Sequence, residues 1–360
     1  MVKRLFAAAL CLLIILSLCG CSGSQGLVRV GVFEPLTGAD SEGGQQELQG
    51  IQLANELYGE AAGRRVVLVT EDNMSDLSAA QSAAERLVGA DRADIVLGSY
   101  GSDYALIGAE VFNGSEVPMI GATCSDVDIT LNRSYCFRVC FTDDYQGRVM
   151  ARCALGSLGA YRAAVIYEGG DSYSEGLRDS FIDGFEEGGG ELVAEAVYGP
   201  SDTDFSAQIL TVMSQQPDVI FAPGGYAQCA ELIVQARELG CEAVFLGCDT
   251  WETEEFILAG GSAVEGAVFS TFYDMNLSLN SRSEEFLSAY LEAYGEEPTA
   301  AAALGFDAYL AAIGAVEAAE ETGGAALREA LRTLSFDGAT GTISFDENGD
   351  ALRSTAALKT

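Results

Sequence analysis

Short apolar runs alternate with longer stretches in which apolar residues recur every three or four positions, from Leu27 onward. A run that is apolar almost throughout is typical of a strand buried on both faces of a sheet, and the longer stretches have the period of an amphipathic helix. This alternation predicts parallel sheets covered by helices on both faces. The expected strands are Val28–Phe33, Val66–Thr70, Ile95–Gly98, Pro118–Gly121, Ala163–Tyr167, Val219–Ala222 and Ala243–Gly247.

The alternation occurs in two rounds. The second round begins near Tyr145, where residues 146–158 have a helical period and precede the strand expected at Ala163. The 360 residues are enough for two domains. Two doubly wound α/β lobes of about 150 residues each therefore fit the length better than one oversized sheet.

The charge and composition exclude several classes of function. The chain has 54 acidic and 19 basic residues, a formal charge of -35, so a nucleic-acid backbone would be repelled. It has no histidine, which removes Ser-His and Cys-His catalysis and all His-ligated metal sites. The only lysines are Lys3 and Lys359, so there is no GK[ST] phosphate loop. We expect no metal and no cofactor.

The N-terminus has the features of an export signal. Lys3 and Arg4 precede the apolar run Leu5–Leu18, which small and polar residues follow. The run is shorter than the roughly 20 residues that cross a membrane comfortably. Residues 1–20 are therefore predicted to be a signal peptide.

The signal ends in Leu18-Cys19-Gly20-Cys21, which resembles a bacterial lipobox, although Cys19 stands where Ala or Ser is usual. In a lipobox the last cysteine is lipidated, which makes Cys21 the candidate; an ordinary cleavage site ending near Cys21 is the alternative. Residues 21–26 would then be a lipid-anchored tether. The protein is accordingly expected at the outer face of the cell membrane, or on the periplasmic side if the cell has an outer membrane.

An odd number of cysteines, seven, follows Cys21, with no CxxC pair and no spacing typical of a metal site. Most are expected to be small buried apolar side chains. A bridge such as Cys124 to Cys136 remains open. The seven are Cys124, Cys136, Cys140, Cys153, Cys229, Cys241 and Cys248.

A family resemblance is carried by motifs along most of the chain. The segment VGVFEPLTG at 30–38, followed by GIQLA at 50–54, is similar to the opening of bacterial solute-binding proteins of the leucine/isoleucine/valine type. The order and spacing of the later motifs make the resemblance specific over nearly all of residues 27–350. These motifs are Glu71-Asp72, Val96–Ser99 with Ser102, Phe137-Arg138, Tyr173–Gly176, Gly224–Tyr226, Ala303–Ala308 and Phe345–Asp350.

The resemblance implies a type I periplasmic binding protein fold, in which two lobes joined by three crossovers close over a ligand like a hinged trap. By analogy the crossovers would fall near Thr142, near Thr271–Tyr273 and near Gly341–Thr342. The first lobe would comprise 27–141 and 274–341, and the second lobe 142–273 and 342–360.

The ligand such a cleft is expected to bind, an amino acid, carries a carboxylate and an ammonium, and each needs directed partners when it leaves water. Strand ends followed by helix N-termini supply such partners. Ser102 follows a strand end, where it would hold the carboxylate or cap a helix. The resemblance places Thr123 and Ser125 at positions that contact the ligand head group; a polar loop without a ligand is the alternative.

The second lobe is expected to supply the partner for the ammonium. Asp249 directly follows a buried strand, and the family commonly has a carboxylate there; capping a helix near Thr250 is the alternative. Tyr173 and Tyr226 match positions that wall the pocket, although either could be an ordinary half-buried tyrosine. Gly43 stands where several relatives carry a further pocket aromatic, which bears on the side-chain preference.

The sequence therefore predicts a membrane-tethered, monomeric binding protein, not an enzyme. It would capture an amino acid, branched-chain or related, and deliver it to the permease and ATPase of an ABC importer. A sensor or scavenger of the same fold, specific for an amide or an aromatic acid, is the alternative. A hydrolase or redox enzyme on a flavodoxin-like sheet is a third hypothesis, against which stand the missing GxSxG and GxGxxG motifs and the missing histidine.

Overall fold

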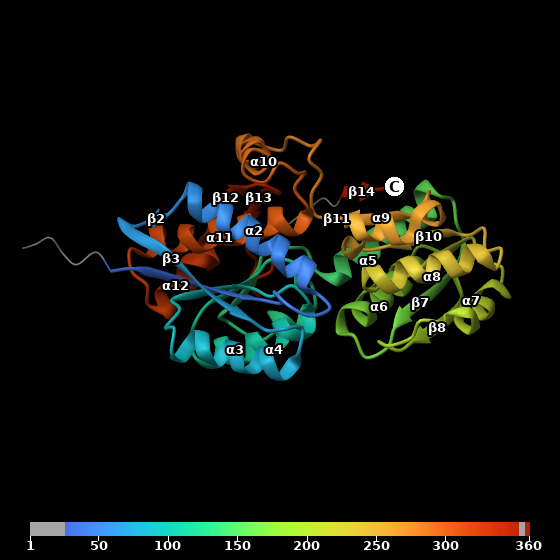
Figure 1. Ribbon diagram of the computed structural model, residues 1–360, viewed down its shortest axis with the longest axis horizontal. Helices are drawn as coiled ribbons and strands as arrows, with labels where there is room; N and C mark the ends of the chain where they lie inside the picture. The colour runs from blue at the N-terminus through green and yellow to red at the C-terminus, as the bar shows by residue number, and fades with distance from the viewer. Residues whose placement is uncertain (1–25, 353–356) are drawn as a thin grey trace, which may run out of the picture.

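Two six-stranded sheets lie side by side along the long axis of the molecule, each covered by helices (Figure 1). The computed structural model describes residues 26–352 and 357–360. The expected signal peptide, Cys21 and nearly all of the tether lie outside the described residues. The predicted fold class, two doubly wound lobes, is confirmed.

The first lobe has the strand order β2-β3-β1-β4-β5-β6, parallel except for β2. Helices α3 and α4 cover one face, and α2, α11 and α12 cover the other (Figure 1). The strands are β1 (Val28–Glu34), β2 (Glu60–Ala61), β3 (Arg64–Asp72), β4 (Ile95–Gly98), β5 (Met119–Gly121) and β6 (Cys136–Arg138). The helices are α2 (Ser41–Leu57), α3 (Leu77–Gly89), α4 (Ser102–Gly114), α10 (Ser281–Tyr294), α11 (Ala300–Ala319) and α12 (Gly324–Thr333), with a 3₁₀ turn at Val127–Ile129.

Helix α11 is the core helix of the first lobe. In the described part of the chain it is the one helix long and apolar enough to cross a membrane, but 83% of that apolar window is buried inside the molecule. Its Gly305 lies so close to α2 that an added Cβ would overlap the backbone of Glu47. The close packing of α11 on α2 therefore fixes the position of Glu47, which lies behind the cleft.

The second lobe has the order β14-β11-β10-β9-β7-β8, parallel except for β14. The strands are β7 (Arg162–Glu168), β8 (Glu191–Tyr198), β9 (Val219–Phe221), β10 (Val244–Gly247), β11 (Val268–Thr271) and β14 (Ala357–Lys359). The helices are α5 (Asp143–Arg152), α6 (Ser172–Glu187), α7 (Ser206–Met213), α8 (Tyr226–Glu238) and α9 (Glu254–Gly260), with short turns at Cys153–Ser157, Asp249–Trp251 and Gly261–Val264.

All seven expected strands are present, and five further strands of the two sheets were not expected: β2, β6, β8, β11 and β14. Strand β6 has only three residues and ends in a charged one. Strand β8 is an edge strand with exposed polar residues, so it lacks the continuous apolar run of a central strand. Cys124 and Cys136 are both buried free thiols, so the Cys124–Cys136 bridge is not formed.

The chain crosses from one lobe to the other where successive residues stop packing in one hydrophobic core and begin to pack in the other. Phe141 packs in the first core and Met150, on α5, in the second. Strand β11 lies in the second sheet, whereas Phe272, directly after it, packs in the first core.

The third crossing lies elsewhere than expected, and the boundary near Gly341–Thr342 is wrong. Strand β13 (Gly341–Ser344) forms a hairpin with β12 (Ser335–Gly338), and Ile343 and Phe345 pack in the first core. The chain reaches the second sheet only at β14, which pairs with β11. Residues 342–352 therefore belong with the first lobe.

A buried arginine holds this segment in place. Arg138, which is fully buried at the end of β6, forms an ion pair of 2.6 Å with Asp350. It also donates hydrogen bonds to Thr130 Oγ1 at 2.8 Å and to the carbonyl oxygen of Asp126 at 2.7 Å. The guanidinium thus ties three segments together near the first crossing.

We predict that Arg138→Met lowers the free energy of unfolding by about 3 kcal/mol, because it leaves a partly buried carboxylate without its partner. Urea unfolding followed by circular dichroism measures the change. The matched control is Arg86→Met, which breaks an exposed ion pair with Glu71 and should cost less than about 1 kcal/mol. Equal losses in the two variants would contradict the role of Arg138.

Candidate functional site

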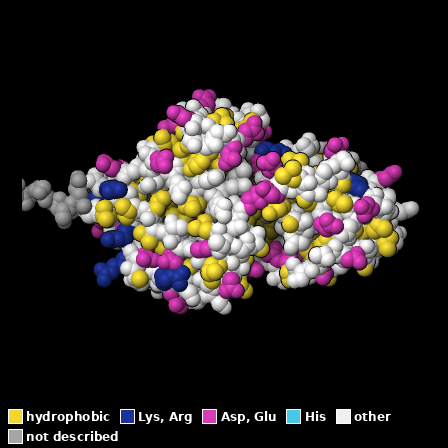
Figure 2. Space-filling view, viewed as in Figure 1, with side chains coloured by type: hydrophobic (Ala, Val, Ile, Leu, Met, Phe, Trp, Pro, Cys, Tyr) yellow, Lys and Arg dark blue, Asp and Glu magenta, His cyan; other side chains and the backbone are white. Residues whose placement is uncertain are grey.

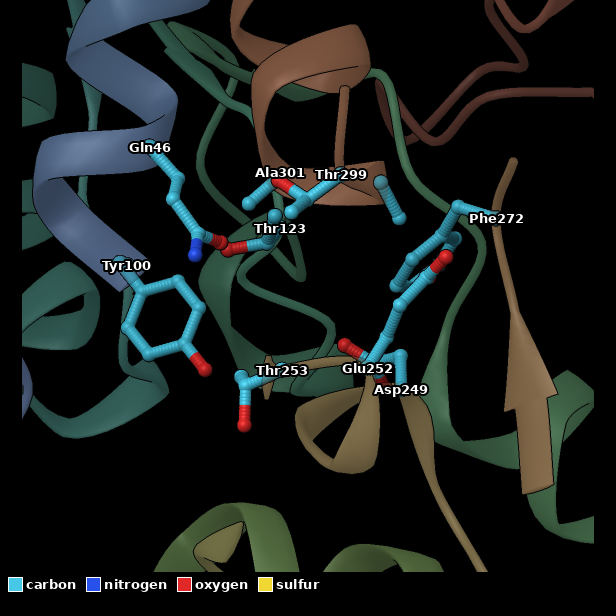
Figure 3. A pocket seen from close by; sticks show the side chains of 10 residues that line it. Gln46, Tyr100, Thr123, Asp249, Glu252, Thr253, Phe272, Thr299 and Ala301 are labelled. Atoms are coloured by element: carbon cyan, nitrogen blue, oxygen red, sulfur yellow. The ribbon is translucent and has the colours of Figure 1, made fainter. Parts of the chain in front are cut away.

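A cavity of about 510 Å³ opens between the lobes. The first lobe contributes the turn before α2, the loop leading into α4 and Thr123; the second contributes residues 168–171, the start of α8 and Asp249. A narrower recess continues from it, where Tyr100 and Thr123 of the first lobe face Asp249 and Thr253 of the second (Figure 3). These segments follow the carboxyl ends of parallel strands, where ligands bind in open α/β sheets.

The first-lobe side of the cavity includes Ser102 and Thr123, as expected. Ser102 is the first residue of α4, and Gly101 is the N-cap of that helix. Ser102 is therefore not the helix cap, which was the alternative role. The backbone N–H groups at this helix start are positioned for an anion. The Thr123 hydroxyl is hydrogen-bonded to Glu47 Oε1.

Ser125 does not line the cavity, which differs from the expectation. It is fully buried, and its carbonyl oxygen accepts a hydrogen bond of 3.0 Å from the Asp143 N–H at the start of α5. Burial raises the pKa of Asp143, and the neighbouring Ser125 side chain partly offsets that rise. Ser125 therefore contributes to the first crossing between the lobes, since the loop after β5 turns its side chain toward α5.

Asp249 lines the cavity from the second lobe. Its Oδ1 accepts hydrogen bonds from Gln146 Nε2 at 2.6 Å and from the Tyr173 hydroxyl at 2.7 Å. Burial raises the pKa of Asp249, and these two donors oppose the rise. Asp249 begins a 3₁₀ turn capped by Cys248, and Thr253 caps the next helix, α9, so Asp249 is not a helix cap.

The aromatic wall of the cavity contains a residue that the sequence analysis missed. Tyr173 and Tyr226 line the cavity as expected, and Tyr100 lines it too. An added Cβ at Gly43 would overlap the Tyr100 ring, so the glycine makes room for this tyrosine. The space beside position 43 is therefore filled by an aromatic ring from the loop before α4. The motif GSYGSDY around Ser102 was the available indication.

The remaining lining includes four carboxylates, two from each lobe. Asp40 and Asp103 come from the first lobe, and Glu168 and Asp171 from the second, with no lysine or arginine among the described lining residues. Burial, followed by the negative charges of the other three, raises the pKa of Glu168 to about 7. In the space-filling view, acidic side chains gather where the two lobes meet (Figure 2).

Two further carboxyl groups lie behind the cavity wall. Glu34 and Glu47 are both fully buried and within hydrogen-bonding distance of one another. Glu34 Oε2 accepts a hydrogen bond of 2.7 Å from the Tyr100 N–H. Burial raises the pKa of Glu34 well above its usual range and that of Glu47 to about 7. Sequence reasoning missed both residues, although Glu34 lies within the motif VGVFEPLTG; Glu47 lies in none of the motifs described above.

Among the described residues, no group of three or more His, Cys, Asp or Glu side chains is arranged to hold a metal ion. The donors of the cavity are hydroxyl, amide and carboxyl groups together with tyrosine rings. Such a set suits hydrogen bonding to a small organic molecule.

Two doubly wound lobes with a lined cavity between them define a hinged solute-binding protein of type I. Residues 27–358 match the family described as periplasmic binding protein, and the chain belongs to that family. It is 29% identical over 340 residues to the Leu/Ile/Val-binding protein BraC3 of Rhizobium johnstonii, which covers 92% of this chain and 90% of the relative.

Solved structures give the same result. The leucine binding protein LivK from Thermotoga maritima superposes with a TM-score of 0.88 and 35% identity, over 92% of this chain and 98% of that chain. LivJ from Streptococcus pneumoniae, solved with isoleucine, has a TM-score of 0.86 and 25% identity, over 93% and 96%. The protein is thus a substrate-binding protein similar to those of branched-chain amino acid ABC transporters.

We predict that Gly43→Ala destabilises the protein by about 1–3 kcal/mol, because the new methyl group collides with the Tyr100 ring. The double variant Gly43→Ala, Tyr100→Ala should lose less unfolding free energy than the two single variants lose together, because the collision is gone. Thermal and urea unfolding of the wild type, the two single variants and the double variant give the double-mutant cycle. Strictly additive losses would show that the two residues do not share this space.

Proposed function

We propose that this protein captures an amino acid between its lobes and delivers it to an ABC importer. The observation that carries the proposal is a single cavity in which Asp249 of one lobe lies opposite Ser102 and Thr123 of the other. The two hydroxyl groups and the start of α4 suit a carboxylate, whereas Asp249 suits an ammonium group. Each lobe supplies only one half of the partners that an amino acid requires.

Closure of the lobes follows from this division. A ligand bound to one lobe keeps one charged end in water, and only the approach of the second lobe completes its hydrogen bonds. Ser172 of the second lobe already donates a hydrogen bond of 2.7 Å to Asp103 of the first, so polar contacts across the cleft are available. The importer would recognise the closed form.

Export and anchoring belong to the same proposal. The signal at 1–20 and lipidation at Cys21 would hold the protein outside the cell beside the permease, with residues 21–26 as the tether. A monomer with two lobes suffices, because both half-sites come from one chain. The family consists of solute-binding proteins, and the proposed role requires no catalysis.

The lining of the cavity bears on the side chain of the ligand. Apart from tyrosine rings, the cavity lining has few apolar groups, and four carboxylates surround its outer part. This lining favours a polar, aromatic or positively charged side chain over a branched aliphatic one. An aromatic acid or an amide is therefore the second candidate ligand class. A thermal-shift screen of the twenty amino acids, benzoate and acetamide separates the classes.

We predict that Asp249→Asn weakens binding of the amino acid found in that screen by about 2–5 kcal/mol, because the ammonium loses its charged partner. Asparagine keeps an oxygen for Gln146 and Tyr173, so the fold should be retained. Isothermal titration calorimetry measures the affinity. Asp183→Asn, an exposed change on α6 of the same lobe, is the control and should bind like the wild type. Unchanged affinity in Asp249→Asn would contradict the assignment.

We also predict that the radius of gyration falls when the ligand is added, because the lobes approach one another. Small-angle X-ray scattering with and without saturating ligand measures the change, and Asp249→Asn at the same ligand concentration provides the control. Identical scattering curves for the wild type in the two conditions would count against the closing trap.

A further inference from the structure

We propose that Glu34 and Glu47 hold a shared proton behind the amino-acid site, and that a second proton on Glu47 turns the Thr123 hydroxyl toward a ligand carboxylate. This inference rests on the proposed function, since it assigns the carboxylate of the ligand to Thr123. It makes Glu34 and Glu47 positioning residues that act through Thr123.

The pair requires at least one proton because of its surroundings. Both side chains have no exposed surface, and one oxygen of each, Glu34 Oε1 and Glu47 Oε2, receives no hydrogen bond from a neighbouring N–H or O–H group. Two ionised carboxylates at hydrogen-bonding distance in a buried site repel one another strongly. A proton between them removes one charge and provides the missing donor.

The groups around the pair provide no compensating positive charge. From the other elements, the Tyr100 hydroxyl, the Cys124 thiol and the Asp249 carboxyl interact with Glu47 or with the pair, and none of them is a cation. Arg138, which contacts Cys124, is bound to Asp350 and to carbonyl oxygens. The protonation of the two carboxyl groups is therefore the available way to reduce their charge.

Thr123 transmits this protonation to the cavity. Its hydroxyl is hydrogen-bonded to Glu47 Oε1, and Thr123 is 7% exposed and lines the cavity. When Glu47 is ionised, the hydroxyl must donate to it and presents only lone pairs to the ligand. When Glu47 is protonated, Glu47 donates to Thr123, and the threonine proton is free to bond to a carboxylate.

The sign of the pH dependence follows. A ligand carboxylate binds better when Glu47 carries its proton, so binding takes up a proton and weakens as pH rises above about 7, the pKa to which burial raises Glu47. Asp249 has the opposite effect, because the ammonium needs its ionised form and binding is lost on the acid side. The two effects together predict an optimum of affinity between the two titrations.

The experiment is calorimetric titration of the full-length protein with L-leucine, L-lysine and L-phenylalanine at pH 6.5, 7.5 and 8.5. For the probe that binds, we expect about tenfold weaker affinity at pH 8.5 than at pH 6.5. Titrations at pH 7.5 in buffers of different ionisation enthalpy should show uptake of up to one proton per ligand. Affinity that is constant over this range, with no proton uptake, would overturn the inference while leaving the proposed receptor intact.

Two variants test whether Glu34 and Glu47 orient the Thr123 hydroxyl or only stabilise the fold. Glu47→Gln gives Thr123 a permanent N–H donor, so its affinity should be independent of pH and should show no proton uptake. Glu34→Gln gives Glu47 a permanent donor that favours its ionised form, so the loss of affinity should move to lower pH. Glu56→Gln, an exposed change on the same helix α2 as Glu47, is the control and should keep the wild-type profile. A uniform loss of affinity at all pH values in both pair variants would contradict the mechanism.

A second measurement does not depend on ligand. Folding raises the pKa of both carboxyl groups. The free energy of unfolding should therefore fall as the pH rises from the ordinary pKa of a carboxyl group to about 7. This fall should be smaller in Glu47→Gln. Urea unfolding between pH 5 and 8 tests it. Equal slopes in wild type and Glu47→Gln would refute the shared proton. If none of the twenty amino acids of the thermal-shift screen binds, the proposed function fails and the coupling to ligand fails with it, whereas the shared proton is still tested by unfolding.

Discussion

Carboxylate groups face one another across the space between the lobes without a lysine or arginine among the described lining residues. In a partly dehydrated cleft, like charges at short range oppose the approach of the two lobes. A positively charged group of a ligand relieves this repulsion and adds hydrogen bonds at the same time. In the proposed function, the acidic lining would make closure of the lobes depend on the charge of the ligand that enters the cleft.

The two sheets largely determine where the side chains that line the cavity lie. Parallel strands end at one edge of each sheet, and the two edges face the same cavity, so each loop needs to reach only a short way. The packing of α11 on α2 fixes Glu47 behind the first-lobe wall, and Gln146 and Tyr173 fix Asp249 in the second. The groups proposed to bind the ligand are therefore held by the cores of the lobes, and any closure of the lobes would take place at the crossings.

Much of the fold was predictable, because apolar runs that must be buried on both faces identify central strands directly. Edge strand β8 and the short strand β6 lack such runs and were missed. The boundary near Gly341 was wrong because local pattern cannot show that β13 pairs with β12, or that Asp350 meets the buried Arg138. Those contacts join segments far apart in the sequence.

The sequence by itself determined the fold class and the family. Of the six ligand-binding residues that it predicted, five line the cavity: Ser102, Thr123, Tyr173, Tyr226 and Asp249. Only the tertiary structure decided that Ser125 turns toward Asp143, that Tyr100 occupies the space above Gly43, and that Glu34 lies beside Glu47. The physical reason is that burial, steric overlap and the pKa of a carboxyl group depend on neighbours brought together by folding, which no local pattern of residues specifies.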